Sequence, residues 1–503
     1  MRPATIEERV RDFVEAERSQ VPVPRAVASR ILHAVEVSRP SPRRPRRAYL
    51  QVAAAVAALL LLGIGIGWMR TTSMTASTQS GTWSSVSTMA IQRANHTATL
   101  LPNGKVLVVG GRGLLSMPSP WGQPASAIAS AELYDPKTRR WSSAGSLSVP
   151  RFGHTATLLS NGKVLVAGGN SAVPNSSYPS GAGSLSSAEL YDPQTNSWSL
   201  AASMRNARAF HTATLLGDGR VLVAGGLVVA GGGQSSTEYP GSVLASAELY
   251  DPVADTWTPT TPMPLAATSQ SATLLFDHRA LVIGGVDRFL DYPIGSSPPI
   301  GVRAAELFDP STNSWSVAPS MSHERISPSI TLLPNHQVLV VGDNGPNENT
   351  AEIFDPAAEQ WSPAPKPAAD RAGHVAALLH SGAVLVAGGL GETSAELFDW
   401  RRNDWTSAGT LNLIRSGATA TVLGDGKVLV AGGFGSGAIA WAGAELYDPQ
   451  GRNVAGITRP RSQVLPGTLA MLVAATAILL ALGLWLLGRR RMSQSQTGVT
   501  WID

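Results

Sequence analysis

Short alternating and apolar runs recur in the same order between Thr82 and Asp448. The second copy reads HTATLL (154–159), KVLVAGG (163–169) and AELYD (188–192), followed by a short segment around Trp198. Alternation with period two, and short apolar runs bounded by turn residues, are typical of β-strands. Each copy therefore predicts four strands, named a, b, c and d in chain order.

The connections favour antiparallel pairing. A pair such as Asn103-Gly104 or Asn161-Gly162 lies between strands a and b. These pairs predict a two-residue type I′ turn, because both of its central residues need positive φ. Between strands c and d, an Asp-Pro pair predicts a second hairpin, in which the Asp side chain caps the turn.

The number of copies follows from the glycine pairs at the end of strand b. They begin at Gly110, Gly168, Gly225, Gly284, Gly388 and Gly432, and Gly342-Asp343 is a degenerate member. A four-stranded unit is too small to bury its own apolar face, so seven units close most economically as blades around an axis. The last copy lacks strand d, and the array begins with an orphan d-like segment around Trp83. We expect this N-terminal strand to complete the seventh blade.

The recurring Gly-Gly, Tyr/Phe-Asp-Pro and Trp, with Met204 and Arg208 after the Trp, resemble the kelch repeat over nearly all of residues 81–450. The resemblance implies a propeller that is either a binding module or, as in the galactose oxidase group, a copper enzyme. Galactose-oxidase-like catalysis requires a Tyr-Cys thioether, and this chain has no cysteine. We predict no catalytic residue, metal site or cofactor, and a propeller enzyme of unknown chemistry is the third-ranked function.

Several polar and aromatic residues recur at one position of the repeat, which indicates a structural role. They are His96, His154, His211 and His374 at the start of strand a; Glu132, Glu189, Glu248, Glu306, Glu352, Glu396 and Glu445 in strand c; and Trp83, Trp141, Trp198, Trp257, Trp315, Trp361 and Trp405 in strand d. We expect each Glu to bond the backbone and each Trp to pack between blades with its N–H paired. The glycine pairs are expected to allow positive φ and close backbone approach.

The connections between strands b and c differ most among the blades. They contain 18 to 20 residues in the first four blades and 5 to 10 in the last three. The long ones carry aromatic residues beside proline, and rigid aromatic side chains suit protein or glycan binding. The candidate ligand-binding residues are Trp121, Tyr178, Tyr239 and Tyr292. The alternative is that each aromatic residue simply folds onto its neighbour.

A second candidate set lies in the connections between strands d and a. Six blades have an arginine three residues before strand a: Arg93, Arg151, Arg208, Arg325, Arg371 and Arg415. Strand alternation places these residues and the b-to-c connections on one face, here called the upper face. A ring of guanidinium groups there can bind a carboxylate or phosphate ligand bidentately. The alternative is that they pair with acidic neighbours or carbonyls inside the fold.

Two uncharged stretches flank the propeller. Val52–Met69 contains 18 residues and Leu469–Gly488 contains 20, each long enough to cross a bilayer. Arginine clusters at 43–47 and 489–491 place both termini in the cytoplasm and the propeller outside, in the cell membrane. The positive charge of the chain lies in these tails, so nucleic-acid binding by the propeller is not implied.

The predicted segments are a cytoplasmic helical and basic segment (1–47), a transmembrane helix (50–69), a linker (70–80), the propeller (81–450), a linker (451–463), a second transmembrane helix (464–488) and a cytoplasmic basic tail (489–503). The first span is interpreted as a signal anchor, because the segment before it is too long for a signal peptide. The second has a rival interpretation, since Leu465-Pro466-Gly467-Thr468-Leu469 resembles a cell-wall sorting signal with Leu469 in place of glycine.

The function predicted is a membrane-anchored extracytoplasmic kelch-type propeller that binds or scaffolds a protein or glycan. In that arrangement, the tethers leave the lower face and the upper face points away from the membrane. The second-ranked function is a transmembrane sensor that signals through the N-terminal head. Two amphipathic stretches within residues 5–36 would there bind a cytoplasmic partner.

Overall fold

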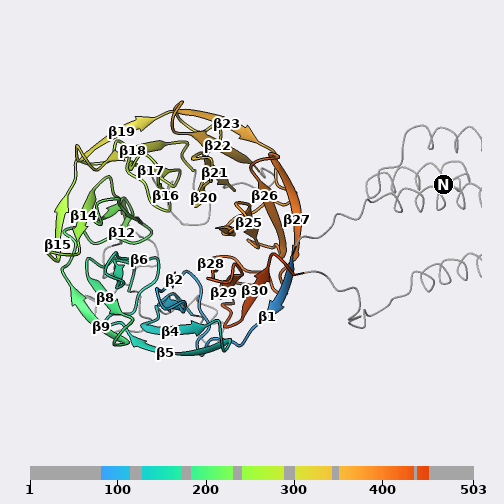
Figure 1. Cartoon of the computed structure of the whole chain (residues 1–503). Coiled ribbons are helices and arrows are strands. Elements are labelled where there is room, and N and C mark those ends of the chain that lie inside the picture. The colour runs from blue at the N-terminus through green and yellow to red at the C-terminus, as the bar shows by residue number, and fades with distance from the viewer. Residues whose placement is uncertain are drawn as a thin grey trace, which may run out of the picture. The chain divides into compact units, whose positions relative to one another are not determined.

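A computed structural model describes residues 81–113, 127–171, 183–229, 241–287, 301–342, 350–435 and 439–451. The strands of this part form seven four-stranded antiparallel sheets and one two-stranded hairpin. Figure 1 shows the sheets arranged as blades of a closed ring. The all-β, seven-bladed propeller predicted from the repeats is confirmed.

Each blade uses four strands in the order a, b, c, d. Blade 1 contains β2 (Thr97–Leu100), β3 (Val106–Val109), β4 (Ser130–Asp135) and β5 (Arg140–Ser146); blade 2 contains β6 (Thr155–Leu158), β7 (Val164–Ala167), β8 (Ala188–Asp192) and β9 (Ser197–Ala201). Blade 3 contains β10 (Thr212–Leu215), β11 (Val221–Ala224), β14 (Ala247–Asp251) and β15 (Thr256–Pro259), with the hairpin β12 (Leu227–Val229) and β13 (Gly241–Val243) between b and c. Blade 4 contains β16 (Ser271–Leu274), β17 (Ala280–Ile283), β18 (Ala305–Asp309) and β19 (Ser314–Ala318).

The remaining blades repeat this plan. Blade 5 contains β20 (Ser329–Leu332), β21 (Val338–Val341), β22 (Ala351–Asp355) and β23 (Gln360–Ala364). Blade 6 contains β24 (Val375–Leu378), β25 (Val384–Ala387), β26 (Ser394–Asp399) and β27 (Asp404–Thr410). Blade 7 contains β28 (Thr419–Val422), β29 (Val428–Ala431), β30 (Ala444–Asp448) and, from the start of the chain, β1 (Thr82–Ser85).

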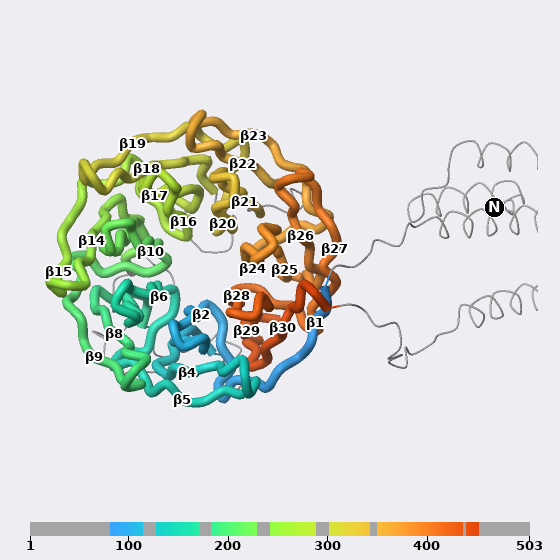
Figure 2. The backbone as a smooth tube through the Cα atoms, in the orientation of Figure 1, coloured from blue at the N-terminus to red at the C-terminus, as the bar shows by residue number. Residues whose placement is uncertain are grey.

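The hydrophobic core lies between blades rather than within them. In Figure 2, the a strands such as β2, β16 and β28 lie near the centre of the ring, and the d strands such as β5 and β19 lie at its rim. Successive side chains of a strand point to opposite faces of its sheet. Accordingly Leu107 and Val109 of β3 pack against blade 2, whereas Val106 and Val108 pack against blade 7. Each b strand is buried because it has a neighbouring blade on both faces.

The first and last strands of the propeller close the ring. Strand β1 pairs antiparallel with β30, with Thr82 opposite Asp448 and Ser85 opposite Glu445. The Trp83 ring lies 5.1 Å from the Tyr447 ring, and its indole N–H donates to the Ala408 carbonyl of blade 6 at 2.8 Å. The predicted closure by the N-terminal strand is confirmed. Both ends of the propeller therefore meet at one place on the lower face.

The turn between strands a and b is not the type I′ turn that was expected. In blade 1 the Leu101 N–H donates to Lys105 O at 2.8 Å, and the Gly104 N–H donates to Leu101 O at 2.9 Å. These bonds enclose a three-residue loop in which Gly104 has φ of 81°, while Asn103 is not among the positive-φ residues. The Asn103 side chain accepts a hydrogen bond from the Lys105 amide at 3.0 Å. The loop is therefore a type I turn followed by a left-handed residue.

The predicted helical head and both predicted spans, 52–69 and 469–488, lie outside the described residues. Within the part of the chain that the structure describes, no helix is long and apolar enough to cross a membrane.

Deleting residues 81–86 removes β1 and leaves β30 as an unpaired edge. Because Trp83 also links blade 7 to blade 6, we expect the free energy of unfolding to fall by more than about 3 kcal/mol. Chemical denaturation followed by tryptophan fluorescence measures the change. The control is Val253→Ala, at a side chain 95% exposed, which should leave stability unchanged. Unaltered stability of the deletion variant would contradict closure by β1.

Candidate functional site

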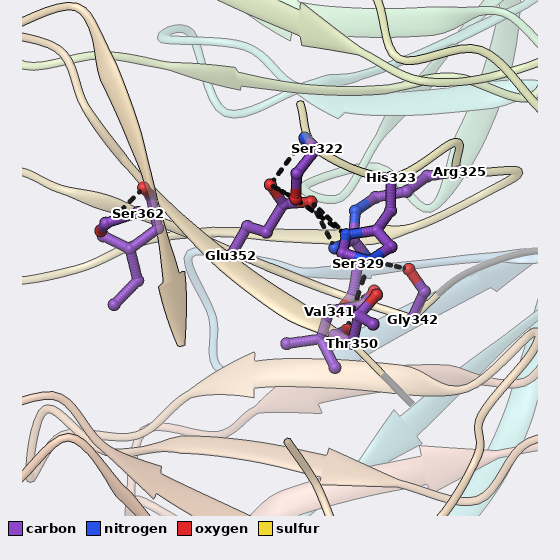
Figure 3. Close-up of polar contacts among 10 residues, drawn as sticks. Ser322, His323, Arg325, Ser329, Val341, Gly342, Thr350, Glu352 and Ser362 are labelled. Carbon is purple, nitrogen blue, oxygen red and sulfur yellow. Dashed lines mark hydrogen bonds and ion pairs between the residues drawn. The ribbon is translucent and has the colours of Figure 1, made fainter. Parts of the chain in front are cut away.

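Six arginines of the d-to-a connections are buried inside their own blades. Arg93 Nη2 donates to Glu132 at 2.8 Å, and its Nη1 donates to the carbonyls of Gly110 at 2.7 Å and Ser130 at 3.0 Å. The equivalent ion pairs are Arg151–Glu189 (2.8 Å), Arg208–Glu248 (2.9 Å), Arg325–Glu352 (2.7 Å), Arg371–Glu396 (2.9 Å) and Arg415–Glu445 (3.0 Å). Figure 3 shows the blade 5 pair, with Ser322 also donating to Glu352.

This geometry corrects the expectation of an anion-binding ring formed by Arg93, Arg151, Arg208, Arg325, Arg371 and Arg415. None of these residues is more than 3% exposed. Their terminal nitrogens point into the blade, where two carbonyls and a carboxylate accept their hydrogen bonds. Burial lowers the pKa of Arg93, and the Glu132 carboxylate opposes that shift. The observed contacts match the alternative prediction, in which these arginines pair with acidic neighbours and carbonyls inside the fold.

The backbone of the same connection joins the preceding blade. The Gly111 N–H of blade 1 donates to Arg151 O of blade 2 at 2.9 Å, and the Gly169 N–H of blade 2 donates to Arg208 O of blade 3 at 2.8 Å. A Cβ atom at Gly110 would lie 2.6 Å from Arg151 O, and both glycines of this pair have positive φ. The expected role of the glycine pair, positive φ and close backbone approach, is confirmed.

The strand-c glutamates also bind the start of the d-to-a connection. Glu132 accepts from the Ala90 amide at 2.7 Å and the Ile91 amide at 3.3 Å. Glu352 accepts from the Ser322 amide and hydroxyl at 2.9 and 2.6 Å. Burial would raise the pKa of Glu352, but the hydrogen bonds from Ser322 and Arg325 outweigh it and lower this pKa. The backbone-bonding role predicted for these residues is confirmed.

The tryptophans of the d strands join neighbouring blades, as expected. The Trp141 indole N–H donates to Ser87 O at 2.8 Å, and Trp198 donates to Ala144 O at 2.7 Å. Trp257, Trp361 and Trp405 donate to carbonyls of the preceding connection, and Trp315 donates to the Thr260 hydroxyl. Each tryptophan thus satisfies its polar group while its ring covers apolar surface.

The repeated histidines link the innermost strands. His96 Nε2 lies 3.0 Å from Thr419 Oγ1 of blade 7, and His154 Nε2 lies 3.0 Å from Thr97 Oγ1 of blade 1. Burial lowers the pKa of His154 to about 3 and that of His374 to about 4, with a further contribution from the adjacent arginine. These rings are therefore neutral at physiological pH. Among the residues described, no three His, Cys, Asp or Glu side chains are grouped to hold a metal.

Blade 4 departs from the other six. Ala267 stands at the position that is arginine in the other six blades. Gln270 stands at the histidine position, where blades 5 and 7 also lack histidine and have Pro328 and Ala418. Its strand-c carboxylate, Glu306, accepts from the Leu265 amide at 2.6 Å, but Oε2 is buried without a partner. Burial raises the pKa of Glu306 to about 7, opposed by the Leu265 amide. The missing arginine is visible in the repeat alignment, whereas the isolated carboxylate becomes evident only from burial.

The four aromatic candidates, Trp121, Tyr178, Tyr239 and Tyr292, lie outside the described residues. On the lower face, an open hollow of about 600 Å³ lies between blades 1 and 2. Its lining includes Asn103, Lys163 and Asp192, and Lys163 pairs with Asp192 at 3.3 Å. Since such turn residues recur around the ring, they do not set this hollow apart chemically.

Comparison with known proteins agrees with the repeat geometry. The Kelch motif matches residues 151–205 and 210–264. Blades 2 and 3 are therefore kelch repeats. The chain is 27% identical to Kelch-like protein 25 of Xenopus tropicalis, over 47% of this chain and 35% of the relative. It is 31% identical to Kelch-like protein 15 of Danio rerio, over 37% of this chain and 29% of the relative. The chain thus spans about a third of the length of these curated relatives.

The kelch propeller also resembles a solved structure described as a novel fungal alcohol oxidase with catalytic diversity among the AA5 family, in complex with copper. The TM-score is 0.56 at 16% sequence identity, covering 73% of this chain and 76% of the oxidase. At this identity the likeness shows a shared fold.

The lowered pKa values of His154 and His374 predict that acid destabilises the kelch propeller. The folded pKa of His374 lies below that of a free histidine, so its contribution to stability is present above pH 6.5 and is lost as pH falls toward 4. His374→Gln, which copies the residue of blade 4, should reduce the loss of unfolding free energy between pH 7 and pH 5 by about 2 kcal/mol. Denaturant unfolding at the two pH values measures this difference.

Exposed His380 supplies the matched control, and His380→Gln should leave the difference between pH 7 and pH 5 unchanged. An equal loss of stability in His374→Gln and in the unsubstituted protein would show that His374 does not cause the acid sensitivity.

Proposed function

We propose that this chain is a membrane-anchored kelch propeller that binds a protein partner outside the cytoplasm through its upper face. Trp121, Tyr178, Tyr239 and Tyr292 are the proposed contact residues. The predicted spans at 50–69 and 464–488 hold the propeller at the membrane.

The observation that carries the proposal is the meeting of the propeller's two ends. Thr82 lies opposite Asp448, so the chain enters and leaves the ring at the same place on the lower face. Because the segments before and after the propeller both leave it at this point, one transmembrane span in each segment suits anchorage of the propeller to the membrane. The antiparallel strand order puts the b-to-c connections on the other face, away from that point.

Blade 3 extends toward the upper face by a two-stranded hairpin. Strands β12 and β13 pair beyond the Gly225-Gly226 step, with Leu227 opposite Val243 and Val229 opposite Gly241. The connection that contains Tyr239 therefore begins and ends on a β-hairpin. The repeated arginines and glutamates bond to each other inside the blades. We therefore assign partner recognition to the b-to-c connections, which differ among the blades. Aromatic side chains on a positioned loop provide contact area at little entropic cost.

Single cysteines test sidedness and partner binding together, because the natural chain has none. Full-length Tyr239→Cys and Val253→Cys variants are treated, in intact cells, with a membrane-impermeant maleimide that carries a photo-crosslinker. Tyr239 belongs to the upper-face connection, and Val253 lies in a c-to-d turn of the lower face and is 95% exposed. We expect both cysteines to be labelled and only Tyr239→Cys to give a discrete adduct, identified by mass spectrometry.

Ala4→Cys in the predicted cytoplasmic head should be labelled only after lysis. Labelling of Val253→Cys only after lysis would contradict an extracytoplasmic propeller. Labelled Tyr239→Cys without any adduct would contradict a partner at the upper face, and an adduct removed by glycosidase would identify a glycan instead of a protein.

A further inference from the structure

Blade 4 keeps the acceptors of the buried arginine but lacks the arginine. In blade 3, Arg208 donates to Gly225 O at 2.7 Å, Ser246 O at 2.8 Å and Glu248 at 2.9 Å. The corresponding acceptors in blade 4 are the carbonyls of Gly284 and Ala304 and the carboxylate of Glu306. Ala304 also replaces the serine whose hydroxyl accepts from Arg208 Nη2 in blade 3. The fourth blade thus differs from its neighbour on both sides of this interaction.

The backbone around the missing arginine is unchanged. Gly226 N–H donates to Ala267 O at 2.8 Å, the same distance as from Gly169 N–H to Arg208 O. Gly284 N–H donates to Ala304 O at 3.0 Å, compared with 3.1 Å between Gly225 and Ser246 in blade 3. The acceptors are therefore held by the same frame as in the other blades, and the difference lies in the side chain at position 267.

Glu306 is an unsatisfied buried carboxylate. The residue is 3% exposed, and its only hydrogen bond among the described residues comes from the Leu265 amide. The equivalent Glu248 receives bonds from Arg208 and from the Arg205 and Asn206 amides. An unpaired buried charge is costly, so Glu306 favours either its protonated form or a cation beside it. The pKa of Glu306, raised to about 7 by burial, reflects this cost.

Neither of the two arginines described near Glu306 supplies that cation. Arg303 is exposed, and its Nε lies 3.9 Å from Glu324. Arg325 of blade 5 donates to Glu352 and to the carbonyls of Gly342 and Thr350. Ala304 and Leu265, whose backbone groups border this position, are partly exposed.

We propose that blade 4 binds a guanidinium cation at the place that an arginine side chain fills in the other six blades. Its N–H groups would donate to Glu306 Oε2 and to the carbonyls of Gly284 and Ala304. Six copies of the same acceptor set already hold a planar guanidinium fork in this chain, which favours that group over a metal ion. The guanidinium can belong to a small molecule such as free arginine or to an arginine of a polypeptide. This site is independent of the aromatic contacts proposed above.

The first test is the melting temperature of the full-length protein in nanodiscs at pH 8, with millimolar methylguanidinium, free arginine or an arginine-containing tripeptide. Sodium chloride at equal ionic strength and calcium chloride are the controls. A ligand that binds only the folded state raises the melting temperature with its concentration. We expect a saturable rise of about 2 °C with methylguanidinium at pH 8 and a smaller one at pH 5.5, where Glu306 is protonated.

Two substitutions at Ala267 sharpen the test. Ala267→Arg should pair with Glu306, raise the melting temperature at pH 8 and abolish the response to methylguanidinium. Ala267→Met adds a long side chain without charge or donors, and it should not reproduce the gain at pH 8. Arg208→Ala, which leaves Glu248 without its guanidinium, is the positive control, because methylguanidinium should partly restore its stability.

The outcomes separate the possibilities. A response in Arg208→Ala but none in the unsubstituted protein would overturn the proposal, as would a gain with calcium and none with methylguanidinium. If Ala267→Arg and Ala267→Met destabilise the protein equally, an arginine at position 267 does not form the buried hydrogen bonds seen in the other six blades. That result would also overturn the proposal. A response to arginine and methylguanidinium but not to the tripeptide would assign the site to small molecules.

Discussion

The contact between each d-to-a connection and the two blades that it joins is the constraint on which the ring depends. In the second blade, the Arg151 side chain is bound by Glu189 and by the carbonyls of Gly168 and Ser187 of the same blade. Its carbonyl meanwhile accepts from Gly111 of the first blade. One residue thus forms hydrogen bonds to two successive blades. The glycine pair is needed at that point because a Cβ atom would collide with the arginine backbone.

A buried ion pair is tolerated here because its hydrogen bonds are nearly complete. Removing two charges from water costs several kcal/mol per ion, and only additional well-formed bonds offset that cost. Each of the six guanidinium groups donates to two carbonyls besides its carboxylate, and each of the six carboxylates accepts from at least one backbone amide besides its guanidinium. In the fourth blade the same carboxylate keeps one amide and loses the cation, which leaves Glu306 Oε2 without a partner. The repeat therefore tolerates the loss of an arginine, but at a cost to its carboxylate.

The repeated parts of the fold could be predicted from the sequence, because the same pattern of residues occurs seven times. Strand order, closure by the segment around Trp83, and the structural roles of glutamate, tryptophan and glycine all follow from position in the repeat. The direction of the arginine side chains did not follow. Strand alternation assigns Arg93 to a face of the propeller, but only packing shows whether its side chain turns outward or into the blade. The turn at Asn103-Gly104 was mistaken for a similar reason, since the same dipeptide serves both two-residue and three-residue loops.

Native-state hydrogen exchange at the glycine pairs tests most directly whether the connections hold the ring together. The amides of Gly111, Gly169 and Gly226 donate to the next connection, at positions 151, 208 and 267. If these contacts hold the ring, their exchange should require the same free energy as global unfolding, equal to that of the buried b strands. Exchange of these glycine amides at much lower free energy, while the b strands stay protected, would show that the blades are held together without them.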